Sequence, residues 1–158
     1  MAFDESIQIA SLQDGQIAII QALEQNSSQH PWSNRQLADC LDHDYLIQTF
    51  AFDSEPEEII GYWILQQVVD ELHLLNFTIS KSYQGRGIGT KVLRQLIENQ
   101  RSEQGISSIY LEVRESNIAA QAVYSKCGFQ QIGERKHYYR NGLHEREKAI
   151  LMRCIICG

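Results

Sequence analysis

The chain has little proline, no long apolar run and no excess of positive charge among its 158 residues. Because a net charge of −6 repels a phosphate backbone, we expect no direct nucleic-acid partner. A membrane-spanning helix needs about 20 apolar residues, and since no stretch approaches that length we expect no membrane partner. The opening residues MAFDESIQIA contain two acidic side chains and no apolar run, which predicts no signal peptide and a cytoplasmic location.

The four cysteines offer no framework for a metal or a disulfide. Cys40 and Cys127 stand alone, while Cys154 and Cys157 form a single C-x-x-C with no second pair and no nearby histidine. Zinc sites combine such a pair with further Cys or His ligands. We therefore predict no metal and no disulfide, and interpret Cys154 and Cys157 as apolar residues that close the last strand.

The hydrophobic content of 43% fits one globular domain over residues 1–158. Alternating hydrophobicity and turn signals predict strands at residues 7–10, 45–52, 59–69, 72–79, 107–114, 130–138 and 147–155. Helical periodicity predicts helices at residues 14–25, from 33 onward, and at 88–104 and 117–127. This order indicates an α/β (α+β) fold with a mixed, largely antiparallel central sheet and helices on both faces.

Two helix ends carry clear local signals. Ser33 and Gln36 have the spacing of a capping box, with Trp32 and Leu37 at the flanking hydrophobic-staple positions. Gly128 is a suitable residue to follow the end of the helix over residues 117–127, because glycine adopts the left-handed conformation at no steric cost.

The densest group of glycines lies in Gln84-Gly85-Arg86-Gly87-Ile88-Gly89, directly before an amphipathic helix. Such a loop is either a tight turn or a phosphate cradle, in which backbone N–H groups approach an anion at the positive end of the helix. Its spacing fits neither the G-x-G-x-x-G fingerprint of dinucleotide-binding folds nor the G-x-x-x-x-G-K-[ST] phosphate loop.

The loop resembles the [QR]-x-x-G-x-[GA] loop of the GNAT acetyltransferases. Its context agrees, since the strand LLNFTIS precedes it and the segment IYLEVRESNIAAQAVYSKCGF, residues 109–129, resembles the second GNAT motif. The segments HPWS, YY and REKAILM, at residues 30–33, 138–139 and 146–152, are similar to the RimI-type branch. The resemblance implies transfer of an acetyl group from acetyl-CoA to the N-terminal alanine of a small-subunit ribosomal protein.

The resemblance also implies which residues hold acetyl-CoA. Backbone N–H groups at a helix N-terminus bind a pyrophosphate without any lysine, and a Cβ on the glycines would hold the anion off. The strand before the loop resembles the one that pairs with the pantetheine amides, although these residues could equally be sheet core. Arg86 either adds charge or is a solvated loop residue, and Asn117 either caps its helix, contacts the donor, or does both. The expected donor-binding residues are Phe77, Thr78, Ile79, Gly85, Arg86, Gly87, Ile88, Gly89, Thr90 and Asn117.

Two residues are candidates for proton transfer. Glu112 shares a strand face with Tyr110 and Arg114, and a carboxylate inside an apolar strand is either a catalytic base or the partner of Arg114 or another cation. Tyr124 is the candidate acid for the leaving thiolate, and its alternative role is that of a core tyrosine. We expect Ala119, Ala122 and Val123 to form the buried face of its helix, with Tyr124 off that face.

The expected acceptor is a basic protein N-terminus, which a chain of net charge −6 would attract. His30, Trp32, Tyr138 and Tyr139 are candidate acceptor contacts, although Trp32 could serve only as the staple and the tyrosines could be surface strand residues. Three other readings stay open: acetylation of a small amine, acetylation of protein lysine, and a silent acyl-CoA-binding module. The sequence does not indicate an oligomeric state.

Overall fold

The computed structural model describes residues 5–141 and 145–157, without the side chains of residues 137–141 and 145–146. The strands are β1 (Ile7–Ser11), β2 (Leu46–Phe52), β3 (Gly61–Val68), β4 (Glu71–Ile79), β5 (Ser108–Arg114), β6 (Gln130–Asn141) and β7 (Glu145–Ile155). The helices are α1 (Ile17–Ser27), α2 (Asn34–Asp39), α3 (Ile88–Ser102) and α4 (Ile118–Lys126). Every predicted strand and helix is present, and the predicted ends differ from these by up to three residues.

The strands of the described residues form one sheet in the order β1-β2-β3-β4-β5-β7-β6. β4 and β5 pair in parallel, whereas β1–β2, β2–β3, β5–β7 and β6–β7 are antiparallel. The predicted fold class, an α/β fold with a mixed and largely antiparallel sheet, is confirmed. None of the described helices is long and apolar enough to cross a membrane.

The chain divides into two compact units. Unit 1 comprises Met1–Gln66 and Leu75–Val92, and unit 2 comprises Gln67–Leu74 and Leu93–Gly158. Unit 1 therefore holds β1, β2, α1 and α2 entire, and unit 2 holds β5, α4, β6 and β7. A single domain over residues 1–158 stays a prediction.

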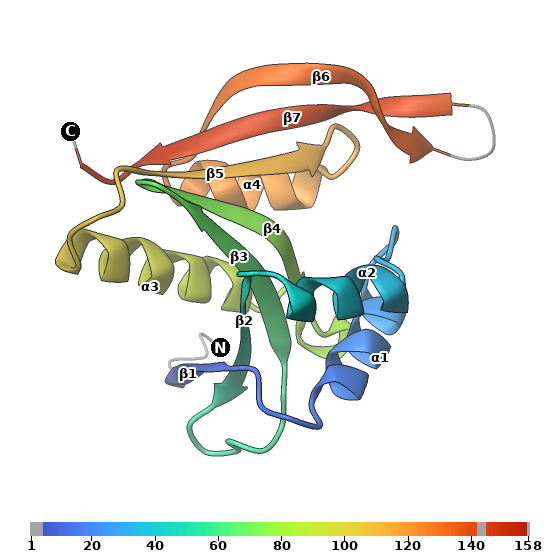
Figure 1. Ribbon diagram of the computed structural model, residues 1–158, viewed down its shortest axis with the longest axis vertical. Coiled ribbons are helices and arrows are strands. Elements are labelled where there is room, and N and C mark those ends of the chain that lie inside the picture. Colours follow the sequence, from blue (N-terminus) through green and yellow to red (C-terminus); the bar gives the residue numbers. More distant parts are fainter. Residues whose placement is uncertain (1–4, 142–144, 158) are drawn as a thin grey trace. The chain divides into compact units, whose positions relative to one another are not determined.

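The core of unit 1 forms where α1 and α2, which contact each other (Figure 1), cover β2 and β3. The predicted capping box is confirmed: Gln36 N–H donates to Ser33 Oγ at 3.1 Å, and Ser33 N–H donates to Gln36 Oε1 at 2.7 Å. Trp32 and Leu37 belong to the same apolar cluster, as a staple requires. The buried members of the cluster are Ile20, Leu23, Leu37, Cys40, Ile47, Tyr62 and Ile64.

In unit 2, β5, β7 and β6 are neighbouring antiparallel strands, with β6 and β7 as the long pair in Figure 1. β5 shows the predicted alternation, with Ile109, Leu111 and Val113 buried. Gly128 follows α4 with φ of 99°, the left-handed conformation expected there. The four cysteines are free, with Cys154 buried in β7 and Cys157 exposed beyond it.

One glycine of unit 1 is required by a close approach of two strands. A Cβ added to Gly61 of β3 would lie 2.7 Å from the backbone oxygen of Thr78 and 2.9 Å from the ring of Phe50. Backbone cannot yield as a flexible side chain can, so the position excludes any larger residue.

We expect Gly61→Ala to lower the free energy of unfolding by about 1–3 kcal/mol, the usual cost of overpacking. Urea denaturation measures the change. Gly133→Ala is the matched control in β6, because its Cβ would meet only the side chain of Leu151, at an ordinary 3.5 Å. Equal stability of Gly61→Ala and the parent protein would contradict the prediction.

Candidate active site

The glycine loop of unit 1 leads from β4 into α3. Gly85 and Gly87 adopt φ of 77° and 79°, both lie exposed, and a Cβ on either would have no neighbour within 4 Å. Residues other than glycine rarely adopt this backbone conformation. The turn therefore requires glycine at both positions whether or not an anion binds there. Gly89 has ordinary space, since its Cβ would lie 3.7 Å from the ring of Phe77.

The start of the loop is held by hydrogen bonds that the sequence did not predict. The Gln84 side chain donates to the backbone oxygens of Ile79, at 2.8 Å, and Ser27, at 3.1 Å. Lys81 N–H donates to Ser27 Oγ at 3.1 Å. The loop is therefore fixed to the ends of β4 and α1, and the first N–H groups of α3 follow it with no acceptor inside their own helix.

The remaining predicted donor-binding residues of unit 1 differ in their surroundings. Arg86 is exposed, with its guanidinium 5.3 Å from the ring centroid of Tyr83, whose hydroxyl donates to Glu58. Ile88 is buried at the start of α3, while Gly89 and Thr90 are half-buried.

The predicted donor strand has side chains committed to the core. Phe77 packs edge-on against Phe50, with ring centroids 6.0 Å apart, and the Thr78 hydroxyl donates to Glu24 at 2.8 Å. The Thr78 side chain is therefore part of the sheet core, whereas Phe77 and Ile79 are half-buried. The predicted contact of these residues with the donor stays a prediction.

A buried carboxylate in α1 is the main feature that sequence reasoning missed. Glu24 is 1% exposed and accepts hydrogen bonds from Tyr62 Oη (2.6 Å), Thr78 Oγ1 (2.8 Å), Asn76 Nδ2 (3.3 Å) and Trp32 N–H (2.9 Å). Burial, followed by the charge of Glu24, raises the pKa of Tyr62, so its phenol stays a donor. The sequence did contain a signal for this burial: Glu24 follows Ile20 by four residues, which places both side chains on the same, buried face of α1.

The structure separates the two predicted acceptor residues of unit 1. Trp32 packs on the core as a staple and also lines a cavity of about 270 Å³. His30 is exposed and does not line this cavity. The full lining is Trp32, Gln36, Asp39, Cys40, His43, Tyr45 and Leu75.

Tyr138 and Tyr139 lie in β6, but their side chains are outside the described residues, so their predicted acceptor contacts stay predictions.

In unit 2, Glu112 lies on the half-buried face of β5, as predicted, with its side chain 28% exposed. Its partner is Arg135 of β6, whose Nη2 lies 3.3 Å from Glu112 Oε1. Arg114 pairs instead with Glu147 of β7, at 3.4 Å. The ion-pair alternative is therefore observed, with Arg135 rather than Arg114 as the cation. The catalytic role of Glu112 stays a prediction.

Glu147 is held much more tightly than Glu112. Its Oε1 accepts hydrogen bonds from Ser116 N–H at 3.0 Å and from Ser116 Oγ at 2.7 Å, and its side chain is 8% exposed. Burial raises the pKa of Glu147, but these bonds and the charge of Arg114 outweigh burial and hold the pKa below its usual value. Glu147 thereby ties β7 to the β5–α4 connection.

The prediction for the faces of α4 was wrong. Tyr124 is buried, its ring centroid lying 5.7 Å from that of Phe129, whereas Ala119 and Ala122 are exposed and Val123 is half-buried. In a helix of nine residues, small alanines set no strong apolar face, so tertiary packing decided which side was buried.

At the start of α4, Asn117 is the predicted N-cap, with Oδ1 accepting from Ala120 N–H at 3.1 Å. Its contact with the donor stays a prediction.

The described residues contain no group of three or more His, Cys, Asp or Glu side chains that could hold a metal ion. Unit 1 thus brings together the glycine loop and the strand before it, and unit 2 carries Glu112, Asn117 and Tyr124. The anion-binding role of the loop and the proton-transfer roles of Glu112 and Tyr124 stay predictions.

The model of the acetyltransferase (GNAT) family matches residues 16–129, and the chain belongs to this family. It is an acetyl-CoA-dependent N-acetyltransferase, which confirms the predicted class of enzyme. Its relatives include the [ribosomal protein bS18]-alanine N-acetyltransferase of Haemophilus influenzae, 39% identical over 134 residues that cover 85% of this chain and 88% of the relative.

Solved structures agree with this assignment. The ribosomal-protein-S18-alanine N-acetyltransferase from Escherichia coli superimposes with a TM-score of 0.84 and 31% identity, over 97% of this chain and 96% of that chain. The predicted resemblance to the RimI-type branch is thereby confirmed. A spermidine N-acetyltransferase mutant from Vibrio cholerae has a TM-score of 0.77 at 19% identity, over 95% of this chain and 94% of that chain, and shares the fold alone.

Proposed function

We propose that this enzyme acetylates the N-terminal α-amine, with alanine first, of a small-subunit ribosomal protein in the cytoplasm. The observation that carries the proposal is the near-full-length match to proteins named for that reaction, with both length and fold shared. The spermidine N-acetyltransferase, whose name indicates a small-amine acceptor, shares only the fold with this chain.

The residues of unit 1 fit the acetyl-CoA donor. Gly85 and Gly87 are exposed in left-handed conformations, and the backbone N–H groups from Gly85 to Thr90 lie at the positive end of α3, which attracts an anion. We assign the pyrophosphate to these N–H groups, with Arg86 beside them. The backbone of Phe77–Ile79 holds the pantetheine arm, and one N–H stabilises negative charge on the carbonyl oxygen. Asn117 is assigned a further donor contact.

When bound, acetyl-CoA supplies a thioester whose carbonyl carbon accepts the amine nitrogen while the thiolate leaves. Glu112 is assigned the proton that the amine loses, because its carboxylate is partly exposed and only loosely paired with Arg135. Tyr124 is assigned the proton that the thiolate gains. Glu112 thus gains one proton and Tyr124 loses one in each turnover. Proton exchange with solvent then returns both side chains to their starting protonation states.

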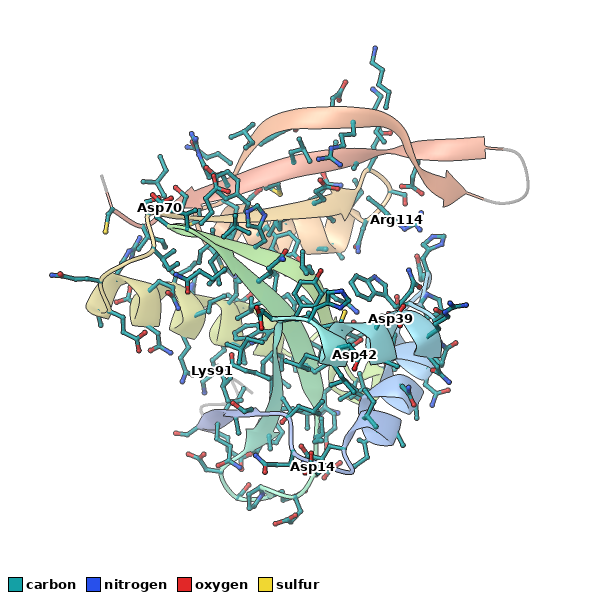
Figure 2. The ribbon with its side chains drawn as sticks, in the orientation of Figure 1. Asp14, Asp39, Asp42, Asp70, Lys91 and Arg114 are labelled. Atoms are coloured by element: carbon teal, nitrogen blue, oxygen red, sulfur yellow. The ribbon has the colours of Figure 1, made fainter. Side chains whose placement is uncertain are left out.

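An α-amine suits such a base better than a lysine does. With pKa values of about 8 and 10.4, roughly a tenth of the α-amine is neutral at pH 7, against well under a thousandth of the lysine. Asp39, at the end of α2 (Figure 2), lines the same cavity as Trp32 and adds negative charge there, and Asp42 follows three residues later. These charges favour a basic acceptor segment, and His30, Tyr138 and Tyr139 are assigned further contacts with it.

The proposed acceptor is tested with an Ala-starting basic peptide that also contains an internal lysine. We expect acetylation of the α-amine, loss of signal when that amine is blocked, and weaker binding as salt rises. Mass spectrometry locates the acetyl group. Acetylation of lysine in the blocked peptide at an undiminished rate, or faster turnover of spermidine than of the peptide, would overturn the assignment.

We expect Gly87→Val to weaken acetyl-CoA binding by at least tenfold in calorimetry, because valine cannot hold φ of 79° without strain. Gly15→Val is the matched control: Gly15 has φ of 86° and equally open surroundings, but it lies in the turn before α1. The control should lose similar stability and keep its affinity. Equal affinities of the two variants would disprove the phosphate-cradle role.

Glu112→Gln and Tyr124→Phe should each lower kcat by roughly 10²–10⁴ with little change in acetyl-CoA affinity, as expected for general base and acid catalysis. Steady-state kinetics with the basic peptide measure the effect. Matched controls are Glu134→Gln, a strand glutamate that pairs with Lys148 at 3.6 Å, and Tyr110→Phe, from the same face of β5 as Glu112. Near-normal rates in both catalytic variants would show that other groups move the protons.

A further inference from the structure

Glu24 is buried and has no role in the proposed chemistry. A carboxylate at 1% exposure is costly unless hydrogen bonds replace its water, and four donors from this chain do so. Apolar packing would have filled the same space with no such requirement. The cluster therefore invites an explanation beyond stability.

The two carboxylate oxygens of Glu24 serve different parts of unit 1. Oε1 accepts from Tyr62 of β3 and from Asn76 and Thr78 of β4, whereas Oε2 accepts from the backbone N–H of Trp32. Glu24 thus connects β3 and β4 with the segment that leads into α2. The end of β4, Phe77–Ile79, is also the part of the sheet that is proposed to bind acetyl-CoA.

The backbone of Trp32 is held on both sides by α1. Its N–H donates to Glu24 at 2.9 Å, and its carbonyl accepts from Gln25 Nε2, also at 2.9 Å. Two consecutive residues of α1 therefore fix one residue of the following loop. Trp32 lines the cavity together with Asp39, so its backbone position bears on one wall of that cavity.

We infer that Glu24 is a positioning residue for the acceptor: it holds the Trp32 backbone so that the indole forms a wall of the cavity that receives the basic peptide. The inference rests on the proposed function for the identity of the acceptor. It assigns Glu24 no contact with the acceptor and no proton transfer. Gln25 also holds the Trp32 backbone, from the solvent-exposed side of α1. Truncation of its side chain therefore leaves the core intact.

The test compares variants by their KM for the Ala-starting basic peptide. Glu24→Ala should raise this KM about tenfold or more, since it removes the acceptor of the Trp32 N–H, while the KM for acetyl-CoA changes less than twofold. Glu24→Gln should recover most of the affinity, because its amide oxygen can accept from Trp32 while its amide nitrogen donates to the rotatable Tyr62 and Thr78 hydroxyls.

Two further variants separate positioning from stability. Tyr62→Phe removes a bond to Glu24 Oε1 but leaves Oε2 on Trp32, so it should lower the melting temperature without changing the peptide KM. Gln25→Ala should raise the peptide KM several-fold with an unchanged melting temperature. If Glu24→Ala fails to fold, Gln25→Ala is the deciding variant, and an unchanged peptide KM in Gln25→Ala would overturn the inference. A peptide KM that rises as much in Tyr62→Phe as in Glu24→Ala would also overturn it.

A spectroscopic measurement keeps this test independent of the acceptor. The chain has two tryptophans, so in a Trp63→Phe background Trp32 alone emits. Glu24→Gln should keep the emission of Trp32 close to that of the background protein, whereas Gln25→Ala should shift it to longer wavelength. An unshifted emission spectrum in Gln25→Ala would refute the positioning role. Failure of the parent enzyme to acetylate the peptide would refute only the proposed function.

Discussion

The interaction on which unit 1 depends is the set of hydrogen bonds around the buried carboxylate of Glu24. A buried carboxyl group fixes its surroundings, because each donor that satisfies its oxygens must stay in place. Tyr62, Asn76 and Thr78 are thereby set against α1, and Trp32 is set against the same helix from the loop side. The glycine loop is then held to the end of this helix through Gln84 and Ser27.

Three glutamates differ in burial and in hydrogen-bond partners, and these differences separate structural roles from the proposed catalytic one. Glu24 is fully buried with four donors, and Glu147 is nearly buried, with Ser116 and Arg114 holding it ionised. Of the three, only Glu112 is partly exposed, with its side chain 28% exposed and paired with Arg135 at 3.3 Å. The first two are committed to structure, whereas Glu112 keeps the accessibility that the proposed base requires.

Much of the fold was predictable because its signals are local. The capping box at Ser33, the N-cap at Asn117 and the alternation along β5 each depend on residues within a few positions of one another. Predictions that needed distant partners did less well. The sequence could not show that Arg135 rather than Arg114 would pair with Glu112, since β6 and β5 are separated by a helix along the chain.

The sequence by itself determined the order of strands and helices, the glycines at the start of α3 and the membership of the acetyltransferase family. These follow from periodicity, backbone conformation and motif spacing, which are written in short stretches of chain. Tertiary structure alone decided that Tyr124 is buried while Ala119 and Ala122 are exposed, and that Glu24 binds four donors from three segments of the chain. The reason is physical: burial and charge satisfaction depend on residues that only folding brings within hydrogen-bond distance.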